Sequence, residues 1–314
     1  MNMTKYLASP KCHQFVIWAS CLCVKVRAMQ RPFYAKLLWG LPLSLYALDA
    51  NAWGLYTHIL FSQWMMATMP LLDPKIRQAI KKFPKLVMAG ACLPDLAVIS
   101  KSFHSTHQWQ KAELLLKSAK SEQEIAIAIG YSSHLFVDVI AHNHFVPAHE
   151  AKWAHVLWMN KSIVTHISSE WAMDAHIAQH IPHCPHHLIL THIEVLSAFI
   201  APCFEVSPQL AKSKLRQLAW ADGLLRVSGL ASIMLWALKL NDTEFVKNLN
   251  YYLTNTSQAL MQIDKSLIGK RPNWQPELHH LNMAEMVAWR EKCLHDLSQY
   301  LATPIKLYKS KKTY

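Results

Sequence analysis

Residues 121–145 read SEQEIAIAIGYSSHLFVDVIAHNHF, and this stretch decides the fold class. Ser121 followed by Glu124 forms a capping box, in which each side chain satisfies a backbone N–H group at the start of a helix. The apolar residues that follow recur at helical spacing for about five turns. The stretch therefore predicts a long helix, and that helix carries His134 and Asp138 within an apolar run.

The rest of the chain also favours helices. Glycine is scarce, at 7 of 314 residues, and we find no repeat and no strand pattern. Further helices are expected over 54–68, 75–83, 152–180, 186–201, 208–239, 242–264 and 283–302. Breaks are expected at Pro70, Pro94, Pro147, Pro182 with Pro185, Pro202 and Pro272, whereas Ser207 and Pro208 should start a helix. We predict one all-α domain over 53–304 and a basic tail over 305–314.

The N-terminal segment resembles a secretory signal. Residues 29–52, MQRPFYAKLLWGLPLSLYALDANA, contain basic residues, a short apolar run and a small-x-small site that ends at Ala52. Cleavage there would leave Trp53 as the first residue of a secreted or periplasmic protein. Met29 is the natural start of this signal, so residues 1–28 form an extension. The alternative is an uncleaved N-terminal membrane anchor.

Composition narrows the chemistry without deciding the substrate. The chain has 19 histidines and 7 cysteines, which fits imidazole-rich metal binding better than thiolate zinc fingers. The formal net charge is +12; without residues 1–52, 26 basic and 19 acidic residues leave +7. That charge suits phospholipid and nucleic acid alike. Cys184 and Cys203 are candidates for a disulfide that the sequence alone does not establish.

Two pairs of polar residues stand four apart on predicted helices. His134 and Asp138 share one helix face, where an imidazole and a carboxylate can bind one divalent cation. His166 and Glu170 repeat this spacing, with Asp174 further along the same face to orient a ligand. The alternative for each pair is a structural histidine or a polar stripe on a solvated helix.

Histidines near these pairs extend the pattern. His144 follows Asp138 by six residues, beyond the expected end of the helix, and His142 is expected to support a ligand or lie on the surface. Asp95 follows a proline, where aspartate ordinarily caps a helix or forms a turn. His104 and His107 follow it in a loop.

The N-terminus created by cleavage supplies the last candidate metal ligands. Once exposed, the α-amino group and carbonyl of Trp53 can chelate a metal together, and His58 lies about one helical turn further along. In this order the residues resemble the zinc-dependent phospholipase C proteins and the related single-strand-specific zinc nucleases. The resemblance covers roughly residues 53–176. It implies an all-α domain around a trinuclear zinc site, that is, three Zn²⁺ ions.

The resemblance also implies which residues bind each ion. The three ligand sets are Asp95, His107, His134 and Asp138; Trp53, His58 and Asp138; and His144, His166 and Glu170. His107 is preferred to His104 because its distance from Asp95 is nearer the family spacing.

The implied activity is phosphodiester hydrolysis, in which a metal-activated hydroxide attacks phosphorus and Asp95 acts as catalytic base. The favoured substrate is a phospholipid, with peripheral contact to a membrane. "LPD" around Asp95 is closer to the phospholipases, whereas the short start "WGLYTH" is closer to the nucleases. The alternatives are an exported single-strand nuclease, with nucleic acid as its partner, and a non-catalytic metal- or membrane-binding protein.

Overall fold

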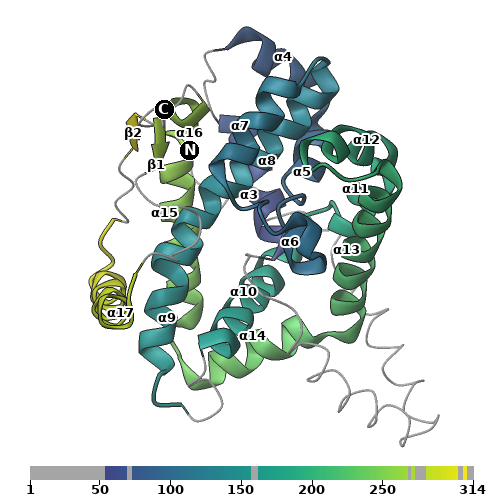
Figure 1. The fold of residues 1–314 in the computed structure, drawn as a ribbon. Coiled ribbons are helices and arrows are strands. Elements are labelled where there is room, and N and C mark those ends of the chain that lie inside the picture. The colour runs from purple at the N-terminus through teal and green to yellow at the C-terminus, as the bar shows by residue number, and fades with distance from the viewer. Residues whose placement is uncertain are drawn as a thin grey trace, which may run out of the picture. The chain divides into compact units, whose positions relative to one another are not determined.

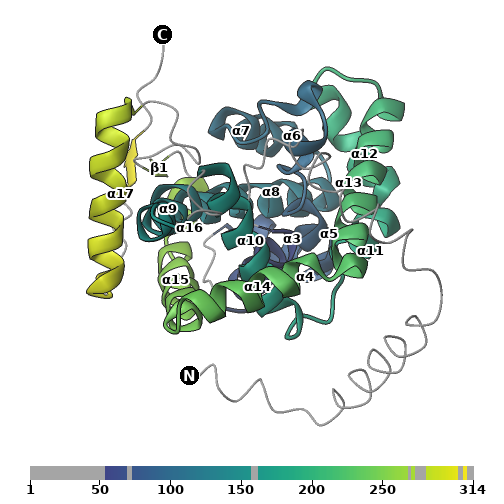
Figure 2. The same cartoon turned by 90° about the horizontal axis from the view of Figure 1, so that it is seen from below.

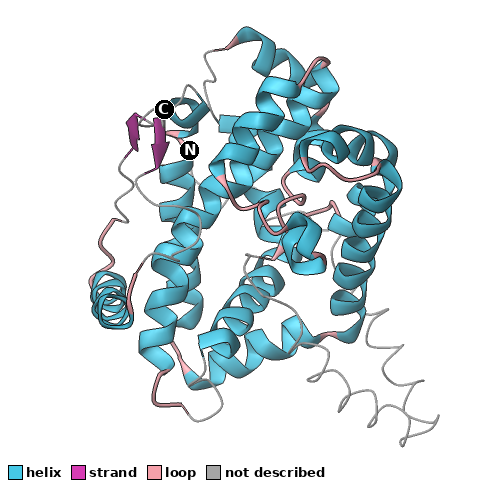
Figure 3. Cartoon of the chain, in the orientation of Figure 1, coloured by secondary structure: helices cyan, strands magenta, loops and turns pink. Residues whose placement is uncertain are grey.

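The computed structural model describes residues 54–68, 73–156, 162–267, 270–272, 281–302 and 307–309. Over these residues the chain is all-α apart from one two-stranded ribbon (Figures 1 and 3). The predicted N-terminal extension, signal and cleavage site, and Trp53, lie outside the described residues.

The helices follow one another with short connections. They are α3 (Leu55–Thr68), α4 (Pro74–Lys82), α5 (Pro84–Gly90), α6 (Leu96–Ile99), η3 (Lys101–Phe103), α7 (Trp109–Ser118), α8 (Glu122–Ile140), η4 (Ala141–Phe145), α9 (Val146–Trp153), α10 (Ser162–Ala178), α11 (Pro185–Thr191), α12 (Ile193–Cys203), α13 (Pro208–Ser228), α14 (Leu230–Asn241), α15 (Phe245–Leu260), α16 (Ile263–Leu267) and α17 (Met283–Ser298). The strands are β1 (Lys270–Pro272) and β2 (Leu307–Lys309), which pair antiparallel.

Helix α8 forms the centre of the core. The predicted capping box of Ser121 and Glu124 is present at its start. Helices α3, α4, α5 and α7 pack against it (Figure 2). The approach to α5 is so close that a Cβ atom on Gly130 would lie 2.0 Å from the carbonyl oxygen of Val87. Glycine is therefore required at this crossing.

One continuous helical segment, Glu122–Trp153, is long and apolar enough to cross a membrane by length and composition, and the bent pairs α11–α12 and α13–α14 also pass that test. Within Glu122–Trp153, however, 94% of the apolar window is buried inside the protein. Burial in the core therefore accounts for its apolar sequence.

Several predicted boundaries differ from the structure. The helix does not break at Pro147, which follows the π-helical turn η4; the carbonyl oxygen of Asn143, four residues earlier, accepts hydrogen bonds from Trp289 and Cys293 instead. The single helix predicted over 152–180 corresponds to two helices, since α9 ends at Trp153 and α10 begins at Ser162. The single helix predicted over 208–239 is divided into α13 and α14 at Gly229, which ends α13 with a φ of 70°. The start of α13 is confirmed, since the Ser207 side chain accepts a hydrogen bond from the Leu210 amide.

Candidate metal centre

Helix α8 and the turn that follows it supply the central residues of the site. His134, Asp138 and His142 stand four residues apart and are all buried. The chain passes from α8 into the π-helical turn η4 without a break. Single π-helical turns inside α-helices are frequent at functional sites.

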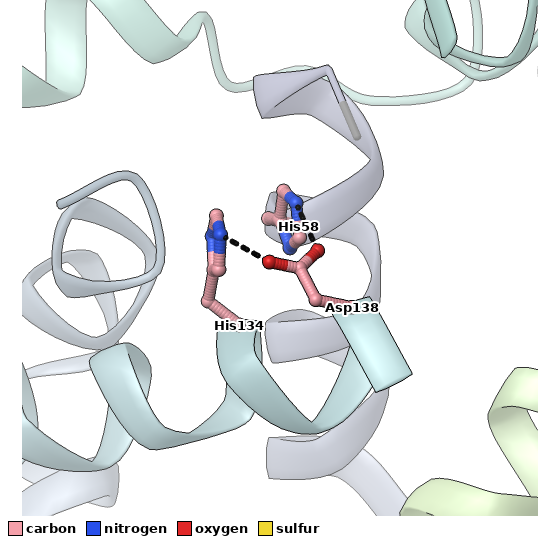
Figure 4. A group of neighbouring side chains, drawn as sticks. All are labelled: His58, His134 and Asp138. Carbon is pink, nitrogen blue, oxygen red and sulfur yellow. Dashed lines mark ion pairs between the residues drawn. The ribbon is translucent and has the colours of Figure 1, made fainter. Parts of the chain in front are cut away.

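The first group of side chains joins α8 to α3. His134 Nε2 lies 2.9 Å from Asp138 Oδ2, and His58 Nε2 lies 3.4 Å from Asp138 Oδ1 (Figure 4). The rings of His58 and His134 stack with centroids 3.5 Å apart. Each oxygen of Asp138 therefore faces a different imidazole.

The backbone fixes which nitrogen of His134 can bind a metal. His134 Nδ1 lies 2.7 Å from the carbonyl oxygen of Ala91, an acceptor, so Nδ1 carries the hydrogen. In the neutral ring, Nε2 then presents a lone pair to the carboxylate of Asp138. Two acceptors at 2.9 Å need a proton or a cation between them. This pair of lone-pair atoms fits a bound metal ion.

A second group lies on the other side of His134. His107 Nε2 is 3.4 Å from Asp138 Oδ2 and 3.9 Å from Asp95 Oδ1, and His134 Nε2 is 3.7 Å from Asp95 Oδ1. Asp95 precedes α6 but makes no side-chain cap there. Its carboxylate is directed at the imidazoles instead.

Two hydrogen bonds hold the loop that presents His107. Thr106 Oγ1 donates to the carbonyl oxygen of Pro94, and Tyr131 donates to the carbonyl oxygen of Thr106. His104 is exposed and bonds through Nδ1 to the carbonyl oxygen of Lys101. The structure therefore brings His107, and not His104, to the other site residues.

The third group contains His142 where the sequence predicted His144. His166 Nε2 lies 2.8 Å from Glu170 Oε1, and His142 Nε2 lies 3.9 Å from the same oxygen. The structure does not bring His144 to this pair; its ring packs on Trp289, with centroids 5.6 Å apart.

The continuation of the helix beyond Asp138 explains this difference. The expected helix end after Asp138 does not exist, so the helical face of Asp138 continues to His142, whose Nε2 is 3.9 Å from Asp138 Oδ1. His144 falls on another face, where burial lowers its pKa to about 4. The i, i+4 spacing from Asp138 to His142 was the signal that could have identified this residue.

Each of the three groups contains a buried carboxylate, whose negative charge is unfavourable away from water. Burial raises the pKa of Asp95 and Glu170 well above their ordinary values and also raises that of Asp138. Among the described residues, neither oxygen of Asp138 accepts a hydrogen bond with proper geometry. Divalent cations would offset these charges, and carboxylates with imidazoles are a ligand set suited to zinc.

Asp174 fixes the start of α3. Its carboxylate accepts hydrogen bonds from the backbone amides of Tyr56 and Thr57, at 3.2 and 2.9 Å, and pairs with Arg226 at 2.6 Å. A Cβ atom on Gly54 would lie 2.1 Å from Asp174 Cγ. The sequence predicted that Asp174 orients a ligand beside His166 and Glu170, whereas in the structure it caps the helix that carries His58.

Comparison with known proteins agrees with this architecture. The sequence model of the zinc-dependent phospholipase C family matches residues 57–214, which is half of the chain. Searches of curated proteins and of solved structures gave no match to the chain. The all-α fold and the clustered histidines and carboxylates are consistent with the match. The chain therefore belongs to the zinc-dependent phospholipase C family.

Proposed function

We propose that the protein is a phospholipase C-type phosphodiester hydrolase that uses zinc at the three groups around Asp138. One observation carries this proposal: the buried carboxylate of Asp138 faces His134 and His107 through one oxygen and His58 and His142 through the other. A carboxylate placed in this way is suited to bridge two cations.

Up to three ions are proposed. The residues that would hold them are Asp95, His107, His134 and Asp138; Trp53, His58 and Asp138; and His142, His166 and Glu170. Relative to the sequence prediction, His142 replaces His144. Zinc, when bound, supplies Lewis acidity toward phosphoryl oxygens and lowers the pKa of a coordinated water.

Two groups of the protein control protons at this site: the Asp95 carboxylate and the Ala91 carbonyl. Asp95 Oδ1 accepts no hydrogen bond from the described residues and lies 3.9 Å from His107 Nε2 and 3.7 Å from His134 Nε2. We assign it as the base that accepts a proton from the attacking water. In the metal-free protein, burial raises the pKa of the Asp95 carboxyl group above its ordinary value. The Ala91 carbonyl keeps His134 Nε2 free of hydrogen for ligation.

An exposed apolar surface on α13 and α14 favours a phospholipid substrate over nucleic acid. Six large apolar side chains on these helices are each at least 55% exposed: Trp220, Leu224, Val227, Ile233, Trp236 and Leu240. Helix α14 packs against α10, which carries His166 and Glu170. Exposed tryptophan and aliphatic side chains with nearby basic residues such as Arg216 and Lys239 suit the interface of a membrane.

The lipid role of this surface has a direct test. Trp220→Ser with Trp236→Ser should weaken binding to phosphatidylcholine vesicles and lower hydrolysis of vesicle lipid. Hydrolysis of a short-chain, monomeric phosphatidylcholine should stay unchanged, because the metal ligands are untouched. Equal losses on both substrates would argue against membrane docking here.

Export belongs to the same proposal. Cleavage after Ala52 would leave Trp53 directly before Gly54, whose position against Asp174 is fixed. Mass spectrometry of the exported protein should therefore find Trp53 first. A different first residue would remove the amine ligand from the second proposed zinc set.

Substrate choice is tested by comparing phosphatidylcholine vesicles with single-stranded DNA. We expect release of a phosphorylated head group, little change with salt, and DNA left largely intact. A nuclease that neutralises several phosphates would instead bind DNA much more weakly as salt rises. Rapid, salt-sensitive DNA degradation without head-group release would favour the nuclease, and zinc binding without turnover on either substrate would favour the non-catalytic alternative.

A further inference from the structure

A second cluster of metal-ligating side chains lies apart from the residues grouped around Asp138. Cys184 directly precedes α11, His186 lies in the first turn of α11, and Asp222 lies on α13. One sulfur, one nitrogen and one oxygen atom from these residues lie within 4.8 Å of one another. Residues 180–192, which contain five histidines, thus supply two members of a site that the proposed hydrolysis does not use.

The geometry distinguishes a metal site from a catalytic thiol. Cys184 Sγ lies 3.1 Å from His186 Nδ1, and Asp222 Oδ2 lies 3.7 Å from the same nitrogen. In a nucleophile–imidazole–carboxylate relay, the nucleophile and the carboxylate contact opposite ring nitrogens. Here both contact Nδ1, so the three atoms surround a common point.

Asp222 supplies the independent evidence for a missing ligand. The residue is 5% exposed, and Oδ2 accepts no hydrogen bond from the described residues. Its other oxygen, Oδ1, accepts from Arg226 Nε and Nη2 at 3.0 and 2.7 Å. A buried carboxylate oxygen without a donor is costly, and a cation would remove that cost.

The local charge also fits a divalent cation. Asp174 and Asp222 place two carboxylates around the single guanidinium of Arg226. Ionisation of the Cys184 thiol would add another negative charge. A divalent cation would balance the resulting excess.

We propose that Cys184 Sγ, His186 Nδ1 and Asp222 Oδ2 bind a thiophilic divalent cation, for which Zn²⁺ is the best match. Thiolate, imidazole and carboxylate are its usual protein ligands, and three of them leave the fourth position to water. The side chain of His186 is 39% exposed, so the ion can reach the site from solvent.

The site would stabilise the start of α3. Tyr56 donates a hydrogen bond to Cys184 Sγ at 3.3 Å, and the guanidinium of Arg226 lies 4.2 Å from the centre of the Tyr56 ring. Tyr56 is two residues before His58, which belongs to the metal centre. A cation here would therefore hold α11 and α13 against the helix that presents that ligand.

Cobalt spectroscopy tests the proposal independently of phospholipid hydrolysis. The proposed ligands around Asp138 are nitrogen and oxygen atoms, so a thiolate-to-cobalt charge-transfer band in the near ultraviolet would not come from them, and its loss in Cys184→Ser assigns it to Cys184. The purified, metal-stripped protein reloaded with Co²⁺ should show this band. Cys184→Ser should lose it, and His186→Ala should require about tenfold or more Co²⁺ to reach it.

Matched controls separate the site from its surroundings. The exposed neighbour His187, changed to Ala, should leave the band intact, as should Cys203→Ser and Asp138→Asn. Zinc K-edge absorption should show a sulfur neighbour at about 2.3 Å. Absence of the band in the unsubstituted protein, its persistence in Cys184→Ser, or an unchanged Co²⁺ requirement in His186→Ala would each overturn the proposal.

Discussion

Asp138→Asn tests whether one carboxylate serves two metals. The substitution keeps the shape of the side chain and removes its charge. In the metal-free protein the new amide N–H can donate to His134 Nε2, which lies 2.9 Å from Asp138 Oδ2. The fold should therefore tolerate the change, while metal binding should not.

The magnitude follows from the number of ligands. A four-ligand structural zinc contributes about 10–16 kcal/mol, so one ligand accounts for about 2.5–4 kcal/mol. That corresponds to roughly 10²–10³-fold weaker binding. Because Asp138 Oδ1 faces His58 and Oδ2 faces His134, the loss should apply to two ions. Activity should fall below detection.

Zinc content after dialysis against buffered Zn²⁺ provides the assay, with thermal unfolding in chelator as the check on folding. The variant should lose more than about one equivalent of zinc. Metal-free variant and metal-free parent should unfold within about 4 °C, equivalent to about 1 kcal/mol. Asp242→Asn is the control, since Asp242 is buried but pairs with Lys152. Loss of one ion or none, with the fold intact, would refute the bridging role.

Further predictions test other parts of the centre. His142→Ala should lower zinc content and activity, whereas His144→Ala should leave zinc content unchanged; the reverse result would restore the sequence-based assignment. His107→Ala should lose metal and His104→Ala should retain it, as measured by zinc content. Gly54→Ala should displace the start of α3 and weaken zinc binding by about tenfold or more, because its Cβ would overlap a buried carboxylate, and an unchanged zinc affinity would contradict this. Burial raises the pKa of the centre's carboxylates above ordinary values of 3.8 and 4.5, so the metal-free protein should lose stability as pH rises above those values. Stabilisation by added zinc should instead grow with pH, because zinc binds the deprotonated ligands. A pH-independent effect of zinc on thermal unfolding would refute this.

Local spacing made part of the centre predictable. The pairs His134–Asp138 and His166–Glu170 depend only on helical periodicity, and the helices form as expected. The capping box of Ser121 depends on residues three apart. Such signals require no knowledge of tertiary packing.

Other features required the tertiary structure. The π-helical turn adds a residue within a turn, which shifts every later side chain to another face, and no local pattern marked it. The cap of Asp174 on α3 joins residues more than a hundred positions apart. The cluster of Cys184 and Asp222 depends in the same way on how α11 packs on α13.

The product of phosphatidylcholine hydrolysis tests the central claim most directly. We propose following zinc-loaded protein and phosphatidylcholine micelles by ³¹P NMR, which separates the phosphodiester from its products. The account predicts a growing phosphocholine monoester signal that disappears with chelator, returns with Zn²⁺, and is absent in Asp95→Asn. A zinc-loaded protein that leaves the phosphodiester signal unchanged, or that produces phosphatidic acid instead, would contradict it.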